Sequence, residues 1–158
     1  MNKFELFKEH INHKYPNKLN INLSPSSSFR CRSEFSYKDN HYVMHDENKK
    51  IYMTSFSKAS NVIQKVMPEL LNEINNSNSI KDKLFQINFR SNKNNNVMVT
   101  LIYHKNVESL VDKIKAISKK LKIQIILRSK KYLYSTNDIF FEDRLNFQNL
   151  KIYQTDNC

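Results

Sequence analysis

Three segments of the chain combine cationic side chains with flat rings, a combination able to hold an unstacked nucleic-acid base beside its phosphates. They are Phe29–Phe35 (FRCRSEF), Lys83–Arg90 (KLFQINFR) and Tyr103–Lys105 (YHK). A structural interpretation competes at two of them. Phe85, Ile87 and Phe89 alternate like residues on one face of a strand, so the pattern alone favours Phe85 as a core residue. Arg30 and Arg32 are equally consistent with a solvated sheet face.

The histidines and the missing glycines argue against metal and cofactor sites. The chain contains no glycine, which excludes the loops that cradle phosphates and dinucleotides through backbone amides at positive φ. His10 and His13 fall on a predicted surface helix, and His41 and His45 flank a predicted strand without cysteines at zinc spacing. We therefore predict no metal site and no cofactor-binding residue in this chain.

Neither cysteine is predicted to be a nucleophile. Cys31 falls on the apolar side of its predicted strand, where a small buried thiol is the usual case. Cys158 is the last residue, with no chain behind it to build a site. Glu142 and Asp143 are neighbours in a predicted turn, which is weak evidence for acid–base chemistry. No residue of the chain is therefore predicted to be catalytic.

The charge balance points to a polyanionic partner. The chain has 26 Lys and Arg against 15 Asp and Glu, a formal net charge of +11. Such a surplus attracts RNA, DNA or an anionic membrane, and charge alone does not choose among them. A compositional explanation also stands, because abundant Lys and Asn with no Gly are typical of an AT-rich genome.

Short apolar segments predict a soluble protein, and the low cysteine count favours a reducing cytoplasm. The longest runs lie near Val97–Tyr103 and Ile123–Leu127, far short of the roughly 20 residues that cross a bilayer. The N-terminal residues lack the apolar core of a secretory signal, and two cysteines indicate no disulfide framework.

The elements that must position these residues are predicted to form an α+β domain with a mainly antiparallel sheet and helices packed on it. The spacing predicts a short amphipathic helix in the first fifteen residues. It predicts a second helix from Ala59 to Ile74, capped by Ser57 and kinked or restarted at Pro68. A third predicted helix is capped by Asn106 and has its lysines on the outside. Predicted strands cover residues 29–37, 42–44, 51–53, 84–90, 97–104, 123–128, 132–134, 139–141 and 151–154, with a hairpin turn at 38–40.

A series of short segments carries a family resemblance. FRCRSEF, TSFSKASNVI, KLFQINF, LIYHK and FFEDRL, in this order, resemble the N-terminal half of bacterial tRNA (uracil-5)-methyltransferases, from about Ser28 to the C-terminus. The resemblance implies methyl transfer from S-adenosylmethionine to C5 of the T-loop uridine of tRNA. It also implies an N-terminal RNA-binding domain followed by a Rossmann-like methyltransferase domain.

The resemblance assigns roles to two residues. Phe85 and His104 match positions that help to form the family's target-uridine pocket, where a base must leave its stack before C5 is accessible. This changes the expectation for Phe85 from core residue to base contact. Arg30 and Arg32 are expected to position phosphates, a hypothesis that rests on charge alone. The expected partner is the T-arm of tRNA, with no DNA and no membrane.

The chain departs from the family at its end. In the family, the segment equivalent to YQTDNC leads into a Phe and a Gln-Pro-Asn element that begin the catalytic half, whereas this sequence stops at Cys158. Cys158 stands where the family usually has serine, and Pro68 is a smaller departure. We therefore expect an N-terminal helix and loop (1–27), an RNA-binding domain (28–145) and a truncated connection (146–158).

The catalytic half, with its cofactor site and nucleophilic cysteine, is expected to be absent, so the chain alone should bind no S-adenosylmethionine and be inactive. Three functional interpretations remain open. The chain is a truncated methyltransferase, half of a split enzyme completed by a separately encoded catalytic half, or a stand-alone RNA-binding module without catalysis.

Overall fold

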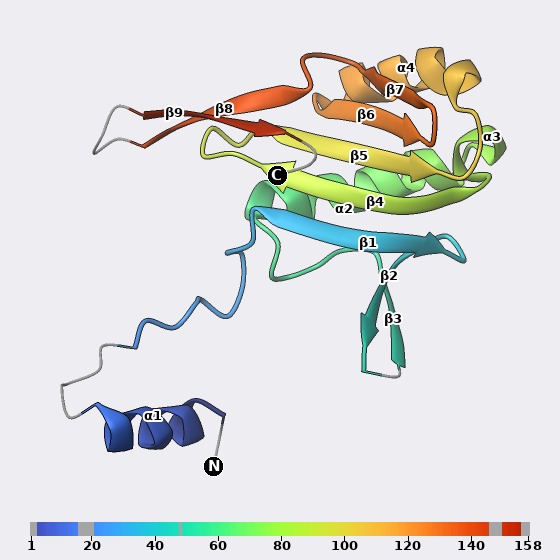
Figure 1. The fold of residues 1–158 in the computed structure, drawn as a ribbon. Helices are drawn as coiled ribbons and strands as arrows, with labels where there is room; N and C mark the ends of the chain where they lie inside the picture. The colour runs from blue at the N-terminus through green and yellow to red at the C-terminus, as the bar shows by residue number, and fades with distance from the viewer. Residues whose placement is uncertain (1–2, 16–20, 48, 146–149, 156–158) are drawn as a thin grey trace.

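A seven-stranded sheet forms the centre of the computed structural model, which describes residues 3–15, 21–47, 49–145 and 150–155 (Figure 1). The strands lie in the order β3-β2-β1-β4-β5-β6-β7. In chain order they are β1 (Arg32–Lys38), β2 (His41–Asp46), β3 (Lys49–Met53), β4 (Leu84–Ser91), β5 (Val97–Tyr103), β6 (Gln124–Ser129) and β7 (Tyr132–Ser135). A second sheet consists of the two antiparallel strands β8 (Phe140–Leu145) and β9 (Leu150–Thr155).

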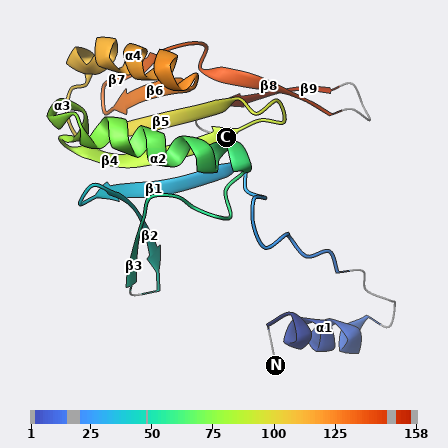
Figure 2. The same cartoon turned by 180° about the vertical axis from the view of Figure 1, so that it is seen from behind.

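The helices are α1 (Lys3–Lys14), α2 (Asn61–Asn75), α3 (Asn78–Lys81) and α4 (Val111–Leu121), the last preceded by a 3₁₀ turn at Glu108–Leu110. Figure 2 shows α2 and α4 on the same face of the sheet. All neighbouring strands of the sheet are antiparallel except β5 and β6, which are parallel because α4 carries the chain back between them. The predicted α+β fold with a mainly antiparallel sheet is confirmed.

The core lies between the sheet and the two long helices. The apolar stripe of α2 supplies Ile63, Met67, Leu70 and Ile74, each fully buried, as its three- and four-residue spacing predicts. On the sheet side, Phe35 contacts the rings of Tyr42 at 5.5 Å, Phe56 at 5.5 Å and Phe89 at 6.1 Å between centroids. Such ring pairs each contribute about 0.5–1.5 kcal/mol beyond the burial of area.

The start of α2 differs from the prediction. Ser57 does not cap it, because the helix begins at Asn61 and Ser60 precedes it. The backbone carbonyl of Ser57 instead accepts a hydrogen bond from the amide of Ser28 at 2.9 Å. The helix does not restart at Pro68. Proline has no N–H for the carbonyl of Gln64, which instead lies 3.5 Å from the hydroxyl of Ser55.

Strand β1 begins at Arg32, three residues later than expected, and this makes the prediction for Cys31 wrong. Cys31 is exposed, because the in-and-out alternation of β1 begins only with buried Ser33 and Phe35. Before β1, Arg30 forms an isolated parallel bridge with Ala59. The predicted turn at Glu142 and Asp143 is also wrong, since both residues lie within β8.

The absence of glycine forces other residues into the left-handed region. Among the described residues, seven have positive φ, and they include Asp39 at 50° and Asn40 at 63°. These two form the predicted turn between β1 and β2, where a tight hairpin requires positive φ at both central positions. No helix in the described ranges is long and apolar enough to cross a membrane.

Candidate nucleic-acid interface

Phe85 occupies a β-bulge at the start of β4. Leu84 pairs with Tyr103 and Gln86 pairs with Ile102, so the register shifts and Phe85 is the extra residue between the two pairs. The extra residue breaks the alternation that the sequence suggested. Leu84 and Ile87 are buried, whereas Phe85 exposes 46% of its surface. A bulge therefore redirects the ring of Phe85 from the core to the surface.

His104 lies beside Phe85 at the end of β5. Its backbone amide donates to the carbonyl of Lys83 at 3.1 Å, which fixes it opposite the bulge. The two rings lie 4.4 Å apart between centroids, with their planes tilted by 52°. The structure thus brings together the two residues that the family resemblance assigned to a target-uridine pocket.

A cavity of about 790 Å³ opens beside these rings. One side is formed by Phe85 of β4 and by residues 102–106, which are the end of β5 and the loop that follows it. The other side is formed by the β6–β7 hairpin, which contributes the end of β6 (Arg128, Ser129), the turn (Lys130, Lys131) and the first residue of β7 (Tyr132). The cavity is large enough for a nucleobase with its sugar and phosphate, since small-ligand sites commonly measure about 300–1,000 Å³.

The charge of the cavity is positive. Lys130 and Lys131 are exposed in the hairpin turn, and Arg128 lies on the strand before it. The ammonium of Lys105 is held by Asp82 at 3.0 Å and by the carbonyl of Ser79 at 2.8 Å. The exposed turn therefore supplies most of the field that an anion would meet.

The side chains that line the cavity are mainly aromatic, basic or uncharged polar groups. Within the described ranges, no carboxylate or cysteine lines it, and no group of three His, Cys, Asp or Glu residues is placed to hold a metal. Burial raises the pKa of Tyr103 above its ordinary value, and its hydroxyl donates to the carbonyl of Ile80 at 2.8 Å. Tyr103 therefore stays protonated and is not a base.

Arg30 and Arg32 lie away from this cavity. Arg32 faces Arg90 across the β1–β4 ladder, and Arg90 is five residues along β4 from Phe85, roughly 17 Å of strand. Arg32 pairs with Glu34 at 2.6 Å, whereas the guanidinium of Arg30 lies 5.7 Å from the ring centroid of Phe29. The structure does not join the two arginines to Phe85 and His104 in one pocket.

Sequence reasoning missed the β6–β7 turn. Its segment reads RSKKY and pairs cations with an aromatic ring, the same signal that selected the other three segments. What the sequence did not reveal is that β6 lies next to β5, which brings Arg128 and Tyr132 to the cavity that contains His104.

Comparison with known sequences gives consistent matches along the chain. Residues 1–158 match the family described as tRNA (Uracil-5-)-methyltransferase. A tRNA/tmRNA (uracil-C(5))-methyltransferase from Campylobacter lari is 33% identical over 144 residues, which cover 88% of this chain and 41% of the relative. The protein of the same name from Aliarcobacter butzleri is 38% identical over 142 residues, covering 82% and 38% respectively. The chain thus spans about two fifths of the length of these relatives.

A solved structure has a similar fold. It is the crystal structure of Pyrococcus abyssi tRNA (uracil-54, C5)-methyltransferase in complex with S-adenosyl-L-homocysteine, which aligns with a TM-score of 0.68. The alignment covers 94% of this chain and 41% of that chain, at 13% sequence identity. At this identity, the likeness concerns the fold.

Proposed function

The chain belongs to the tRNA (uracil-5-)-methyltransferase family, and we propose that it is the tRNA-binding part of such an enzyme. The membership confirms the resemblance drawn from the five short segments. The proposed activity of the complete enzyme is methylation of a T-loop uridine at C5, with S-adenosylmethionine as methyl donor. The names of the relatives support the uracil C5 of tRNA as the target, and the demethylated cofactor in the similar solved structure supports the donor.

The contact between Phe85 and His104 carries the proposal. An exposed phenylalanine ring at a bulge provides a face for a base that has left its stack, and stacking of this kind contributes about 1–3 kcal/mol per base. The imidazole of His104 can hydrogen-bond a uracil edge. Lys130 and Lys131 lie where the phosphates beside such a base would be attracted.

The arginines are proposed to act farther along the RNA. Arg32 pairs with Arg90 near the far end of β4 from Phe85, and Arg30 lies two residues before Arg32, so both would meet phosphates outside the target nucleotide. A contact of this kind positions the RNA without reading its sequence.

The residues of the cavity do not fit the methyl donor. S-adenosylmethionine carries a positively charged sulfur, whereas the cavity is lined by four cations, namely Lys105, Arg128, Lys130 and Lys131. The chain also lacks the glycines that let a backbone close around a nucleotide cofactor. We therefore propose that this chain alone neither binds the donor nor methylates RNA, and calorimetric titration with S-adenosylmethionine tests the first point directly.

The division of the chain is part of the proposal. Residues 28–145 form the RNA-binding unit, residues 1–27 an N-terminal helix and loop, and residues 146–158 a connection. Of that connection, β9 is described, and residues 146–149 and 156–158 lie outside the described ranges. The cytoplasmic location remains a prediction.

Binding of a T-arm hairpin by the chain tests the function. We expect fluorescence anisotropy to show tighter binding to the hairpin than to a loopless duplex of the same length and charge, because only a loop offers an unstacked base. Equal affinities would contradict a base-binding pocket. A methylation assay with donor and tRNA, with and without cell extract, then separates a stand-alone binding module from half of a split enzyme.

A further inference from the structure

A second hollow, of about 570 Å³, lies at the opposite end of β5 and β6 from the Phe85–His104 cavity. Both strands begin there, because they are parallel, and α4 ends there because it runs back along them. Lys115, Lys119 and Lys122 line it from α4 and the residue after it, and Asn96, Gln124 and Asn137 line it from the strand ends and loops. We call it the lysine hollow.

The lysine hollow carries positive charge that the described residues do not neutralise. Neither Lys119 nor Lys122 forms an ion pair with another described residue. Lys115 lies 3.7 Å from Asp112, but the side chain of Asp112 is 98% exposed, so solvent screens the pair. By contrast, Lys120 pairs with Glu73 at 2.6 Å and does not line the hollow. No described carboxylate lines it.

The end of α4 explains part of this arrangement. Cations near a helix C-terminus offset the helix dipole by about 0.3–1 kcal/mol each, which accounts for lysines at this position. The dipole does not account for the hollow that these lysines share. Ammonium groups form charge-assisted hydrogen bonds with phosphate oxygens.

We propose that the lysine hollow binds a backbone phosphate of the same RNA whose unstacked base occupies the Phe85–His104 cavity. This inference rests on the proposed function. The two sites are separated by the length of β5 from Val97 to Ile102, roughly 17 Å. The hollow therefore contacts a part of the RNA several nucleotides away from the target base and adds affinity without sequence preference.

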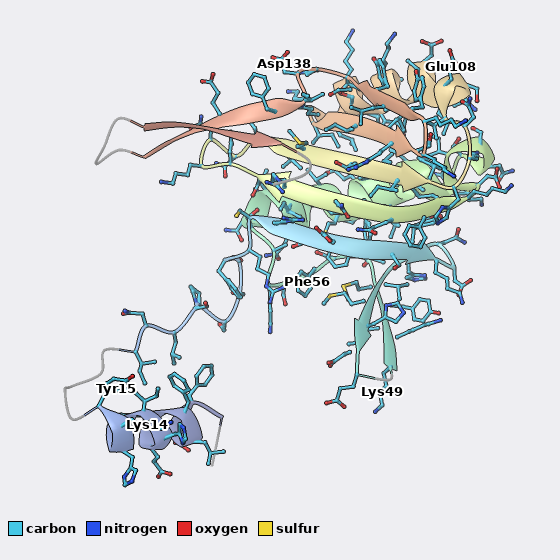
Figure 3. All side chains as sticks on the ribbon, in the orientation of Figure 1. Lys14, Tyr15, Lys49, Phe56, Glu108 and Asp138 are labelled. Atoms are coloured by element: carbon cyan, nitrogen blue, oxygen red, sulfur yellow. The ribbon has the colours of Figure 1, made fainter. Side chains whose placement is uncertain are left out.

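The test replaces Lys119 and Lys122, the two lysines of the hollow that form no ion pair with another described residue. Lys119→Gln/Lys122→Gln is compared with Lys49→Gln/Lys50→Gln, which removes the same charge from the hairpin that projects from the sheet (Figure 3). We expect the first variant to bind the T-arm hairpin about tenfold more weakly at 0.1 M salt. The slope of log affinity against log salt should also fall by about 1. The control should stay within about twofold of the unmodified chain.

Failure of this proposal differs from failure of the proposed function. If Phe85→Ala weakens hairpin binding but Lys119→Gln/Lys122→Gln behaves like its control, the lysine hollow alone is excluded. If the chain shows no preference for the hairpin and Phe85→Ala has no effect, the proposed function fails. Loss of binding to anionic lipid vesicles without loss of RNA binding would identify a membrane surface as the partner and overturn the inference.

Discussion

Phe85 and Phe89 lie on the same strand, four residues apart, yet Phe85 exposes 46% of its surface and Phe89 only 1%. Strict alternation would place both on one face. The bulge between Leu84 and Gln86 separates them, so that Phe89 packs against Phe35 and Tyr42 while Phe85 meets His104. One strand therefore provides both a core anchor and a base platform.

This pair gives a matched test of the platform. We expect Phe85→Ala to lower the affinity for a T-arm hairpin by about 1–3 kcal/mol, the value of one stacked base, with little change in stability. Phe89→Ala should lower the free energy of unfolding by about 3–5 kcal/mol, because it empties a core position. Anisotropy titrations and urea unfolding of both variants measure the two effects. Unchanged RNA binding by a folded Phe85→Ala variant would show that the ring of Phe85 does not stack on an RNA base.

Local patterns predicted most of the elements. Spacing alone predicted helices at the positions of α2 and α4. It also predicted the β1–β2 and β4–β5 hairpins. The predicted cap of α2 at Ser57 and the predicted burial of Cys31 were wrong. Both depend on the residue at which an element begins, and contacts outside the segment determine that residue. Pairing of β5 with β6 is also non-local.

The site was predicted only in part for the same reason. Phe85 and His104 were named from a family resemblance, while alternation alone favoured a buried Phe85. A bulge is a property of two paired strands and leaves no mark in one of them. The contribution of Lys130 and Lys131 depends on strand order, which a single sequence does not reveal.

The two arginines before and within β1 should differ in their effect on RNA binding. Arg32 forms an ion pair with Glu34 at 2.6 Å, so part of its charge is already compensated. The described residues include no acid paired with Arg30. We expect Arg30→Gln to weaken RNA binding more than Arg32→Gln, and to do so equally for RNAs of different sequence. An equal or larger effect of Arg32→Gln in anisotropy titrations would contradict this assignment.

Two buried tyrosines should make stability fall at alkaline pH. Burial raises the pKa of Tyr42 and of Tyr103 above the usual value near 10, with a smaller contribution from Tyr37. The unfolded chain therefore loses these protons first as pH rises. Stability that is fully present below about pH 10 should decline above it, by about 1.4 kcal/mol per pH unit for each tyrosine.

The variant that tests this decline is Tyr42→Phe. The hydroxyl of Tyr42 donates to the carbonyl of Met67 at 2.9 Å, so its removal should lower the free energy of unfolding by about 1 kcal/mol at neutral pH. Above pH 10, however, the variant should lose stability less steeply than the unmodified chain. Urea unfolding between pH 7 and 11 measures both, and an identical alkaline slope would show that Tyr42 does not cause the decline.

Lys122 should separate stability from RNA binding. It follows the last residue of α4 with φ of 54° and ψ of 44°, a left-handed conformation that glycine adopts without steric cost. Lys122→Gly is therefore expected to stabilise the fold by about 0.5–1 kcal/mol, while removing one cation from the lysine hollow. The melting temperature should rise by roughly 1–4 °C as hairpin affinity falls. Lys122→Ala removes the same cation without relieving the backbone, so it should weaken binding equally and give no stabilisation. If both variants bind RNA as tightly as the unmodified chain, Lys122 serves the helix end alone.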